Sequence, residues 1–161
     1  MITNQALVLF LIFAPMKNTT LGLLLSLGIL FASCGGSKKY SVDKLPEQFV
    51  EMGNGGGFTG IYTYYKIATN GQIFTSQSGD TAYSLFGKMP KKIAKAAFNS
   101  LGKLTTNAIS EPGNLNHFMF RADGDSMTSW LWSDDKKPNK ELNEIYETLN
   151  TQISNINKTI K

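Results

Sequence analysis

Ile61-Tyr62-Thr63-Tyr64-Tyr65-Lys66-Ile67-Ala68-Thr69-Asn70-Gly71-Gln72-Ile73-Phe74-Thr75-Ser76-Gln77 carries the strongest hairpin signal in this chain. Two runs of β-branched and aromatic residues, which favour strands, flank the dipeptide Asn70-Gly71. Because Asn-Gly supplies the positive φ angles of a type I′ turn, we expect a hairpin with a two-residue loop. That register pairs Thr69 with Gln72 and Ile67 with Phe74. One face, the better candidate for the core, then carries Ile61, Tyr65, Ile67 and Phe74. The other face carries Tyr62, Tyr64, Lys66 and Ile73.

A second hairpin is expected downstream, with strands His117 to Arg121 and Met127 to Trp132 about Asp123-Gly124. Alternation divides its side chains between two faces, one with Phe118, Phe120, Met127 and Leu131, and the other with His117, Met119, Trp130 and Trp132.

Two segments have helical periodicity. Pro90 begins a predicted helix to about Leu104, because proline suits a first helical turn and apolar residues recur at helical spacing. A second apolar stripe predicts a helix from about Asn139 to Asn157, with Asn139 as its cap. With a short strand over Ala82 to Phe86, the order ββ-α-ββ-α predicts an α+β fold: an antiparallel sheet of four to five strands with both helices on one face.

The segment from Met16 to Cys34 has a charged start, an apolar middle and small residues directly before the only cysteine. It resembles the lipobox of bacterial lipoproteins, with Phe31 where an aliphatic residue is usual. The resemblance implies cleavage before Cys34 and lipidation of Cys34, and with them a location in the cell envelope. The alternative, a transmembrane anchor, needs roughly 20 apolar residues, and the run from Leu21 to Ala32 is too short.

This resemblance divides the chain into three parts. Residues 1–33 would be a signal peptide whose true start is Met16, residues 34–45 a lipidated flexible tether, and residues 46–161 a single α+β domain. The sequence after Cys34 lacks the aspartate or acidic run that directs some lipoproteins elsewhere. By resemblance this implies the periplasmic face of the outer membrane.

Charge and cysteine usage exclude several classes of function. The formal net charge of +4 is too small to indicate a nucleic-acid partner, which an extracytoplasmic protein would seldom meet. If Cys34 is lipidated, the chain has no cysteine left for a disulfide, a thiolate nucleophile or a zinc site. We expect no cofactor and no metal.

The segment Gly55-Gly56-Gly57-Phe58-Thr59-Gly60 matches the dinucleotide pattern G-x-G-x-x-G. That fingerprint opens a helix, whereas this segment opens a strand-forming run, so nucleotide binding is not expected. Two interpretations remain, namely glycines that permit a bulge or a tight entry into the strand that begins at Ile61, and a flexible loop that presents its backbone to a partner. The segment also resembles small metallopeptidase inhibitors of the emfourin type, over half a dozen positions.

The other candidates for chemistry favour structural interpretations. His117 is the only histidine and has no Gly-x-Ser-x-Gly elbow beside it, which favours a hydrogen-bonded or surface residue. Asp123-Gly124-Asp125 lacks the further ligands of an EF-hand and fits a hairpin tip. Asp134-Asp135 fits a solvated linker better than a catalytic carboxylate pair.

Aromatic residues give the remaining candidate site. Tyr62 and Tyr64 on one hairpin, and Trp130 and Trp132 on the other, could share the sheet face opposite the helices. If uncovered, such a face would bind a protein or glycan; alternatively, the last helix or the tether covers it.

The leading hypothesis is a lipid-anchored, non-enzymatic envelope module that binds a protein or glycan through this face or through the loop Gly53 to Gly60. The alternative is an inhibitor or immunity-type protein that inserts the same loop into a protease or toxin, and an enzyme using His117 is a third hypothesis. The candidate binding residues are Gly55, Gly56, Gly57, Phe58, Tyr62, Tyr64, Trp130 and Trp132.

Overall fold

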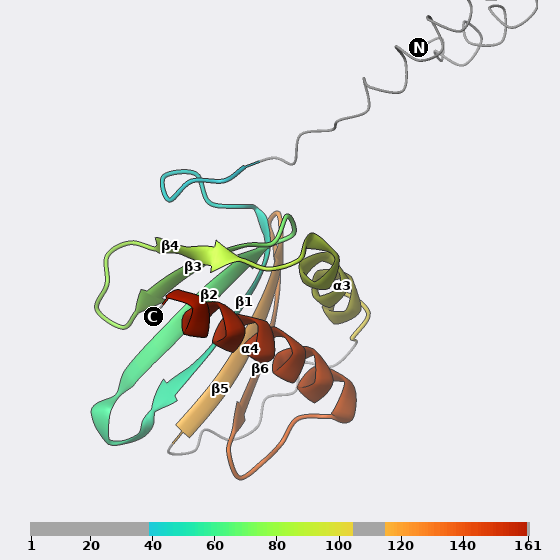
Figure 1. Ribbon diagram of the computed structural model, residues 1–161. Coiled ribbons are helices and arrows are strands. Elements are labelled where there is room, and N and C mark those ends of the chain that lie inside the picture. Colours follow the sequence, from blue (N-terminus) through green and yellow to red (C-terminus); the bar gives the residue numbers. More distant parts are fainter. Residues whose placement is uncertain (1–38, 105–114, 161) are drawn as a thin grey trace, which may run out of the picture. The chain divides into compact units, whose positions relative to one another are not determined.

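The computed structural model describes residues 39–104 and 115–160, which carry six strands and two α-helices (Figure 1). In chain order these are β1 (Gln48–Gly56), a short 3-10 turn η1 (Gly57–Thr59), β2 (Ile61–Ala68), β3 (Gln72–Gln77), β4 (Ser84–Lys88), α3 (Lys91–Leu101), β5 (Leu115–Asp123), β6 (Ser126–Ser133) and α4 (Lys140–Ile160). Lys38–Lys161 form one compact unit. None of the described helices is long and apolar enough to cross a membrane.

The strands form one sheet in the order β4-β3-β2-β1-β5-β6, with every neighbouring pair antiparallel. The predicted α+β class and antiparallel sheet are confirmed, but the predicted strand number and order are wrong. The strand that the sequence did not predict, β1, lies between β2 and β5 near the middle of the sheet (Figure 1). It was missed because its second half, Gly53-Asn54-Gly55-Gly56, consists of residues that strands usually avoid.

The first hairpin forms with a three-residue loop instead of the predicted two-residue loop. The loop lies between Ala68 and Gln72, and the Gly71 amide donates to the Ala68 carbonyl at 2.8 Å. Gly71 has a φ of 91°, as in a turn followed by a residue of positive φ. The extra loop residue shifts the pairing by one position, so Ile67 lies opposite Ile73 and not Phe74. Phe74 is therefore buried on the other face of the sheet from the predicted one.

The core lies between the helices and one face of the sheet. Strand side chains of this face include Val50, Met52, Ile67 and Met119, and they pack with residues of both helices, among them Phe98, Leu101, Leu142 and Leu149. Trp130 and Trp132 also belong to this cluster, with 0% and 5% of their surface exposed. The face composition predicted for the second hairpin is confirmed, because Met119 pairs with Trp130 and His117 with Trp132. Placing the tryptophans opposite the helices was wrong, because both belong to the core on the helix side, where Tyr146 of α4 packs on Trp132 as the alternative of cover by the last helix predicts.

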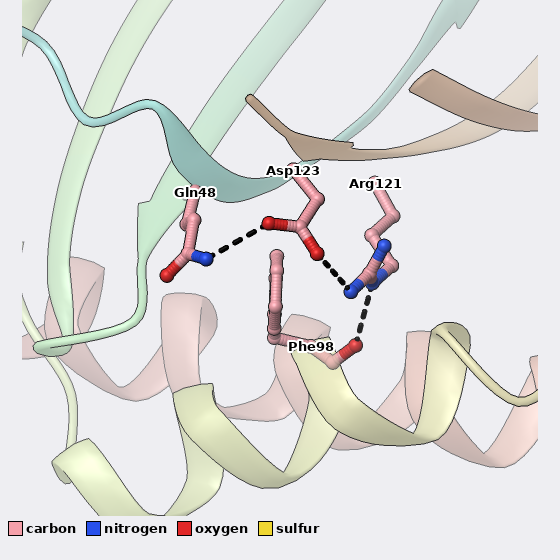
Figure 2. Close-up of polar contacts among 4 residues, drawn as sticks. All are labelled: Gln48, Phe98, Arg121 and Asp123. Atoms are coloured by element: carbon pink, nitrogen blue, oxygen red, sulfur yellow. Dashed lines mark hydrogen bonds and ion pairs between the residues drawn. The ribbon is translucent and has the colours of Figure 1, made fainter. Parts of the chain in front are cut away.

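Arg121 of β5 ties α3 to the sheet (Figure 2). Its Nε donates to the Phe98 carbonyl at 3.0 Å, and its guanidinium lies 4.1 Å from the centre of the Phe98 ring. Its Nη2 bonds to Asp123 at 2.9 Å, and the other oxygen of Asp123 accepts from Gln48 Nε2 at 2.8 Å. The arginine thus joins the last turn of α3 to β5, and through Asp123 to the start of β1.

Residues 39–46 lead into the first strand of the sheet. The backbone of Tyr40 makes two hydrogen bonds with the side chain of Gln72, at 2.8 and 3.0 Å, and Pro46 is buried. The structure describes residues 39–45 of the predicted tether, and this part is hydrogen-bonded to β3 at Tyr40. Residues 1–33 and Cys34 lie outside the described residues, so the signal peptide and the lipid anchor stay predictions.

Candidate binding surface

The loop between β1 and β2 presents Phe58 to solvent. Gly56, Gly57 and Gly60 have φ angles of 103°, 61° and 64°, which residues with a side chain rarely adopt. These glycines fold the chain into the 3-10 turn Gly57–Thr59 and return it into β2. Phe58 at the centre of the turn is fully exposed, at 107% of its reference area. Of the two interpretations of the glycine segment, a tight entry into the strand that begins at Ile61 is confirmed.

Two further apolar side chains lie beside this loop. Ile61 and Leu115 both pair with Gly56, from β2 and β5 respectively, and Ile61 is 51% exposed. Alternation places them on the face of the sheet that carries the core, but Ile61 lies beyond the buried part of that face, so its predicted burial is wrong. We call Phe58, Ile61 and Leu115 the apolar tip. It lies at the end of β1 opposite the end where the chain enters the sheet (Figure 1).

The structure gives the G-x-G-x-x-G match no nucleotide-binding context. The glycines end one strand, form a 3-10 turn and begin another strand, and no α-helix starts there. That motif binds a pyrophosphate because the N-terminus of the following helix points at the phosphates.

Four aromatic rings lie on the sheet face opposite the helices. Tyr64 and Phe118 lie 5.3 Å apart, Phe118 and Phe120 5.5 Å apart, and Tyr62 stacks beside Tyr64 at 6.4 Å between ring centres. These rings cover a strip of β1 that has no side chains, because Gly53 pairs with Tyr64 and Phe118, and Gly55 pairs with Tyr62.

This aromatic row is half-buried by its own packing. Tyr62 and Tyr64 are both only partly exposed, and the Tyr62 hydroxyl accepts a hydrogen bond from Asn116 at 3.2 Å. Gly55 is buried beneath Tyr62. Of the four aromatic residues that could share the face opposite the helices, the structure brings Tyr62 and Tyr64 together there and places Trp130 and Trp132 in the core.

Lys66 forms a second polar and aromatic cluster on the same face. Its ammonium lies 3.4 Å from Glu51, 4.4 Å from the centre of the Phe49 ring and 4.3 Å from that of Tyr83. Burial, reinforced by the nearby Glu51 carboxylate, raises the pKa of Tyr83 to about 12. No local pattern in the sequence indicates this cluster, because Tyr83 reaches Lys66 from the connection between β3 and β4. The Lys66 ammonium is already paired with the Glu51 carboxylate, which favours a role for this cluster in holding the sheet together.

His117 is held at both ring nitrogens. Nδ1 lies 3.0 Å from the Tyr146 hydroxyl, Nε2 lies 2.6 Å from Asp134, and the ring stacks on Trp132. The prediction of a hydrogen-bonded histidine is confirmed, although the sequence did not identify its partners. A cavity of about 190 Å³ adjoins this group, with Lys137 and Glu147 in its wall. Burial, reinforced by the nearby carboxylates of Glu147 and Asp134, raises the pKa of Tyr146 to about 12.

The acidic candidates have structural positions. Gly124, at a φ of 59°, and Asp125 form the loop of the second hairpin, which confirms the hairpin tip predicted for Asp123-Gly124-Asp125. Asp134 is exposed but bound to His117, so it is more than a solvated linker residue. Within residues 39–104 and 115–160, no group of three histidine, cysteine, aspartate or glutamate residues could hold a metal ion.

A groove of about 360 Å³ runs between the two helices. Its lining includes the apolar residues Ile93 and Ala97 of α3 and Ile145 of α4, together with the acidic residues Glu141 and Glu144 of α4. The sequence did not predict it, because it depends on how two separate amphipathic helices meet.

A scan against models of protein families gives no match, and a search of the curated proteins likewise finds none.

Proposed function

We propose that this chain is a lipid-anchored, non-enzymatic envelope protein that binds a protein partner through the apolar tip. The observation that carries the proposal is the full exposure of Phe58 on a turn fixed by three glycines of positive φ. Burying a phenylalanine side chain stabilises a complex by roughly 1.5–3 kcal/mol. Aromatic residues are also enriched at protein interfaces.

The surroundings of Phe58 favour a protein over a glycan. The segment from Gly55 to Ile61 carries no charged side chain, and its only side-chain hydrogen-bonding group is the Thr59 hydroxyl. That hydroxyl already contacts the Gly56 carbonyl at 3.5 Å. A sugar needs polar groups for its hydroxyls, whereas an apolar pocket on a protein needs only the rings and methyl groups that the tip offers.

The chain enters the sheet at the end of β1 that lies opposite the apolar tip. Cys34 precedes Lys39 by a few residues, and the chain then enters β1 at Gln48 and reaches the tip after Gly56. A strand of this length spans about 30 Å. The location itself, the periplasmic face of the outer membrane, rests on the lipobox resemblance alone.

An inhibitor is the second candidate, and one observation favours it. A hairpin loop with a single fully exposed aromatic side chain has the shape of a segment that enters a cleft. The identity of the partner distinguishes the two candidates: a peptidase or toxin whose activity falls on binding would indicate inhibition.

Site-specific cross-linking of the lipidated chain in its own envelope tests the proposal. A photo-reactive residue replaces Phe58 in one variant and Leu85, which is 59% exposed on β4, in a control. We expect one discrete protein adduct from position 58 that is absent from position 85. Equal adduct patterns at both positions, or no adduct at position 58, would contradict the proposal. Purified partner should then bind the unmodified chain and lose binding to Phe58→Ser but not to Leu85→Ser.

A further inference from the structure

The two edges of the sheet differ in how they resist pairing with another strand. The outer strand β4 has five residues, ends in Lys88, and has a bulge where Gly87 pairs with Ile73 but Leu85 pairs with Phe74. Short length, lysine and bulges are the features that protect natural edge strands. The other outer strand, β6, has eight residues, pairs with β5 without interruption, and contains neither a charged residue nor a proline.

The hairpin geometry shows which backbone groups of β6 face outward. Its loop is Gly124-Asp125, so Ser126 bonds to Asp123 across the turn and forms a hydrogen-bonded pair with it. In an antiparallel ladder hydrogen-bonded and non-hydrogen-bonded pairs alternate. The N–H and C=O groups that point away from β5 are therefore those of Met127, Ser129 and Leu131, whereas the Ser133 carbonyl accepts from the Lys136 amide at 3.1 Å. None of the described strands pairs with this edge.

We propose that β6 pairs antiparallel with β6 of a second copy of this chain, about a twofold axis at Ser129. In this register Ser129 lies opposite Ser129 of the copy, and Met127 lies opposite Leu131. Met127 is 66% exposed in the single chain, so the pairing would cover an apolar side chain on each copy. Three hydrogen-bonded pairs would give about six backbone hydrogen bonds between the copies.

Self-complementarity is what favours a second copy over an unrelated strand. On the helix side of the sheet the same register places Ser126 opposite Trp132 and Thr128 opposite Trp130, a small residue against a large one each time. Moving the register by two residues in one direction would bring the two Trp130 residues opposite each other, and in the other direction the two Thr128 residues. Because β6 has no charge, no register sets like charges against each other. A twofold axis through the sheet also leaves the helices of both copies on the same side.

Thiol cross-linking of the full-length chain in membranes tests this pairing. Cys34 is the only cysteine, so the wild-type chain serves as the blank. With a short thiol cross-linker, we expect Ser129→Cys to form a dimer about tenfold faster than Ser84→Cys, a control on β4. The reason is that Cα atoms of a hydrogen-bonded pair lie about 5.5 Å apart. Equal rates, or cross-linking of Ser129→Cys only to a different protein, would overturn the proposal.

A charge exchange on the Ser129→Cys background then tests the register. Met127→Lys or Leu131→Glu alone should slow dimer formation severalfold, because each sets a charge against an apolar side chain of the copy. The two changes together should restore the rate, because each introduced lysine would then face an introduced glutamate of the other copy. Circular dichroism must show that each variant is folded. Failure of the double variant to recover, with its fold intact, would exclude this register.

Discussion

The ring of Phe118 lies against the α-carbon of Gly53 on the neighbouring strand, and the two residues pair directly across the ladder. A Cβ added at Gly53 would lie 2.7 Å from Cζ of this ring and closer still to the Thr63 carbonyl oxygen. The glycine of β1 and the aromatic row that covers it are therefore one packing unit. This explains how a sequence so poor in side chains becomes a strand near the middle of the sheet.

Gly53→Ala should destabilise the domain by about 1–3 kcal/mol, because the added methyl group has no room between the ring and the carbonyl. Asn54→Ala is the control, since Asn54 is the exposed neighbour on the same strand. Urea unfolding followed by circular dichroism measures both. Equal effects of the two changes would show that close packing around Gly53 is not limiting.

Arg121→Met should lower the free energy of unfolding by about 2 kcal/mol, in the range for hydrogen bonds to charged groups. Methionine keeps an apolar stem beside the Phe98 ring but removes the donor to the Phe98 carbonyl, which then loses its bond at 3.0 Å. Lys103→Met, at an exposed position just after α3, should change stability by less than about 0.5 kcal/mol. The same urea titration measures both variants. If Arg121→Met lost no more stability than Lys103→Met, the proposed role of Arg121 in joining α3 to the sheet would be contradicted.

Gln48→Ala should raise the pKa of Asp123 toward its ordinary value near 3.8, because the Gln48 amide is the main cause of its lowered pKa and Arg121 the second. A folded-state pKa below the unfolded value stabilises the fold above the unfolded pKa, and this contribution is lost as the pH falls through the folded pKa. The acid sensitivity from Asp123 therefore lies below about pH 4. Titration of the Asp123 carboxyl carbon by NMR checks the shift, and an unchanged titration curve would refute it.

Tyr146→Phe should reduce the loss of stability between about pH 10 and pH 12. Burial raises the pKa of Tyr146 from 10.0 to about 12 in the folded state. A raised pKa stabilises the fold fully below the unfolded value, and the contribution disappears as the pH rises through the folded pKa. Thermal melting across this range should show a shallower decline for the variant than for the wild type. Tyr83→Phe should act in the same direction, because the pKa of Tyr83 is also raised to about 12.

Much of the fold follows from local patterns in the sequence. Both helices form close to the predicted limits, as Lys91–Leu101 and Lys140–Ile160, and Asn139 caps the second by accepting from the Leu142 amide at 2.9 Å. The second hairpin has the predicted division of side chains between its two faces, because alternation sets it, although its loop is Gly124-Asp125 and not Asp123-Gly124. Each of these features depends on residues that are close together in the chain.

What could not be predicted depends on distant contacts. β1 needs the rings of Tyr64 and Phe118 to cover its glycines, so its own residues do not indicate a strand. The alternation of β6 is visible in the sequence, but which face meets α4 is fixed only by Tyr146 packing on Trp132. Of the candidate site, the sequence identified Phe58 and its glycines, whereas Leu115 joined it only through pairing with Gly56.

Gly71→Ala and Gly79→Ala together separate backbone strain from close packing. Both glycines have positive φ, at 91° and 93°, so each alanine bears a similar strain of about 1–2 kcal/mol. At Gly79 an added Cβ meets nothing within 4 Å, whereas at Gly71 it would meet the Met89 carbonyl at 2.3 Å. Gly71 also accepts a hydrogen bond from the Met89 amide at 2.9 Å, so the clash would displace the start of α3 as well as the turn.

We expect Gly71→Ala to be the more destabilising by at least about 1 kcal/mol in urea unfolding, in line with the cost of overpacking. Equal losses would mean that strain alone selects glycine in the three-residue loop, and that the contact between this loop and Met89 adds no stability.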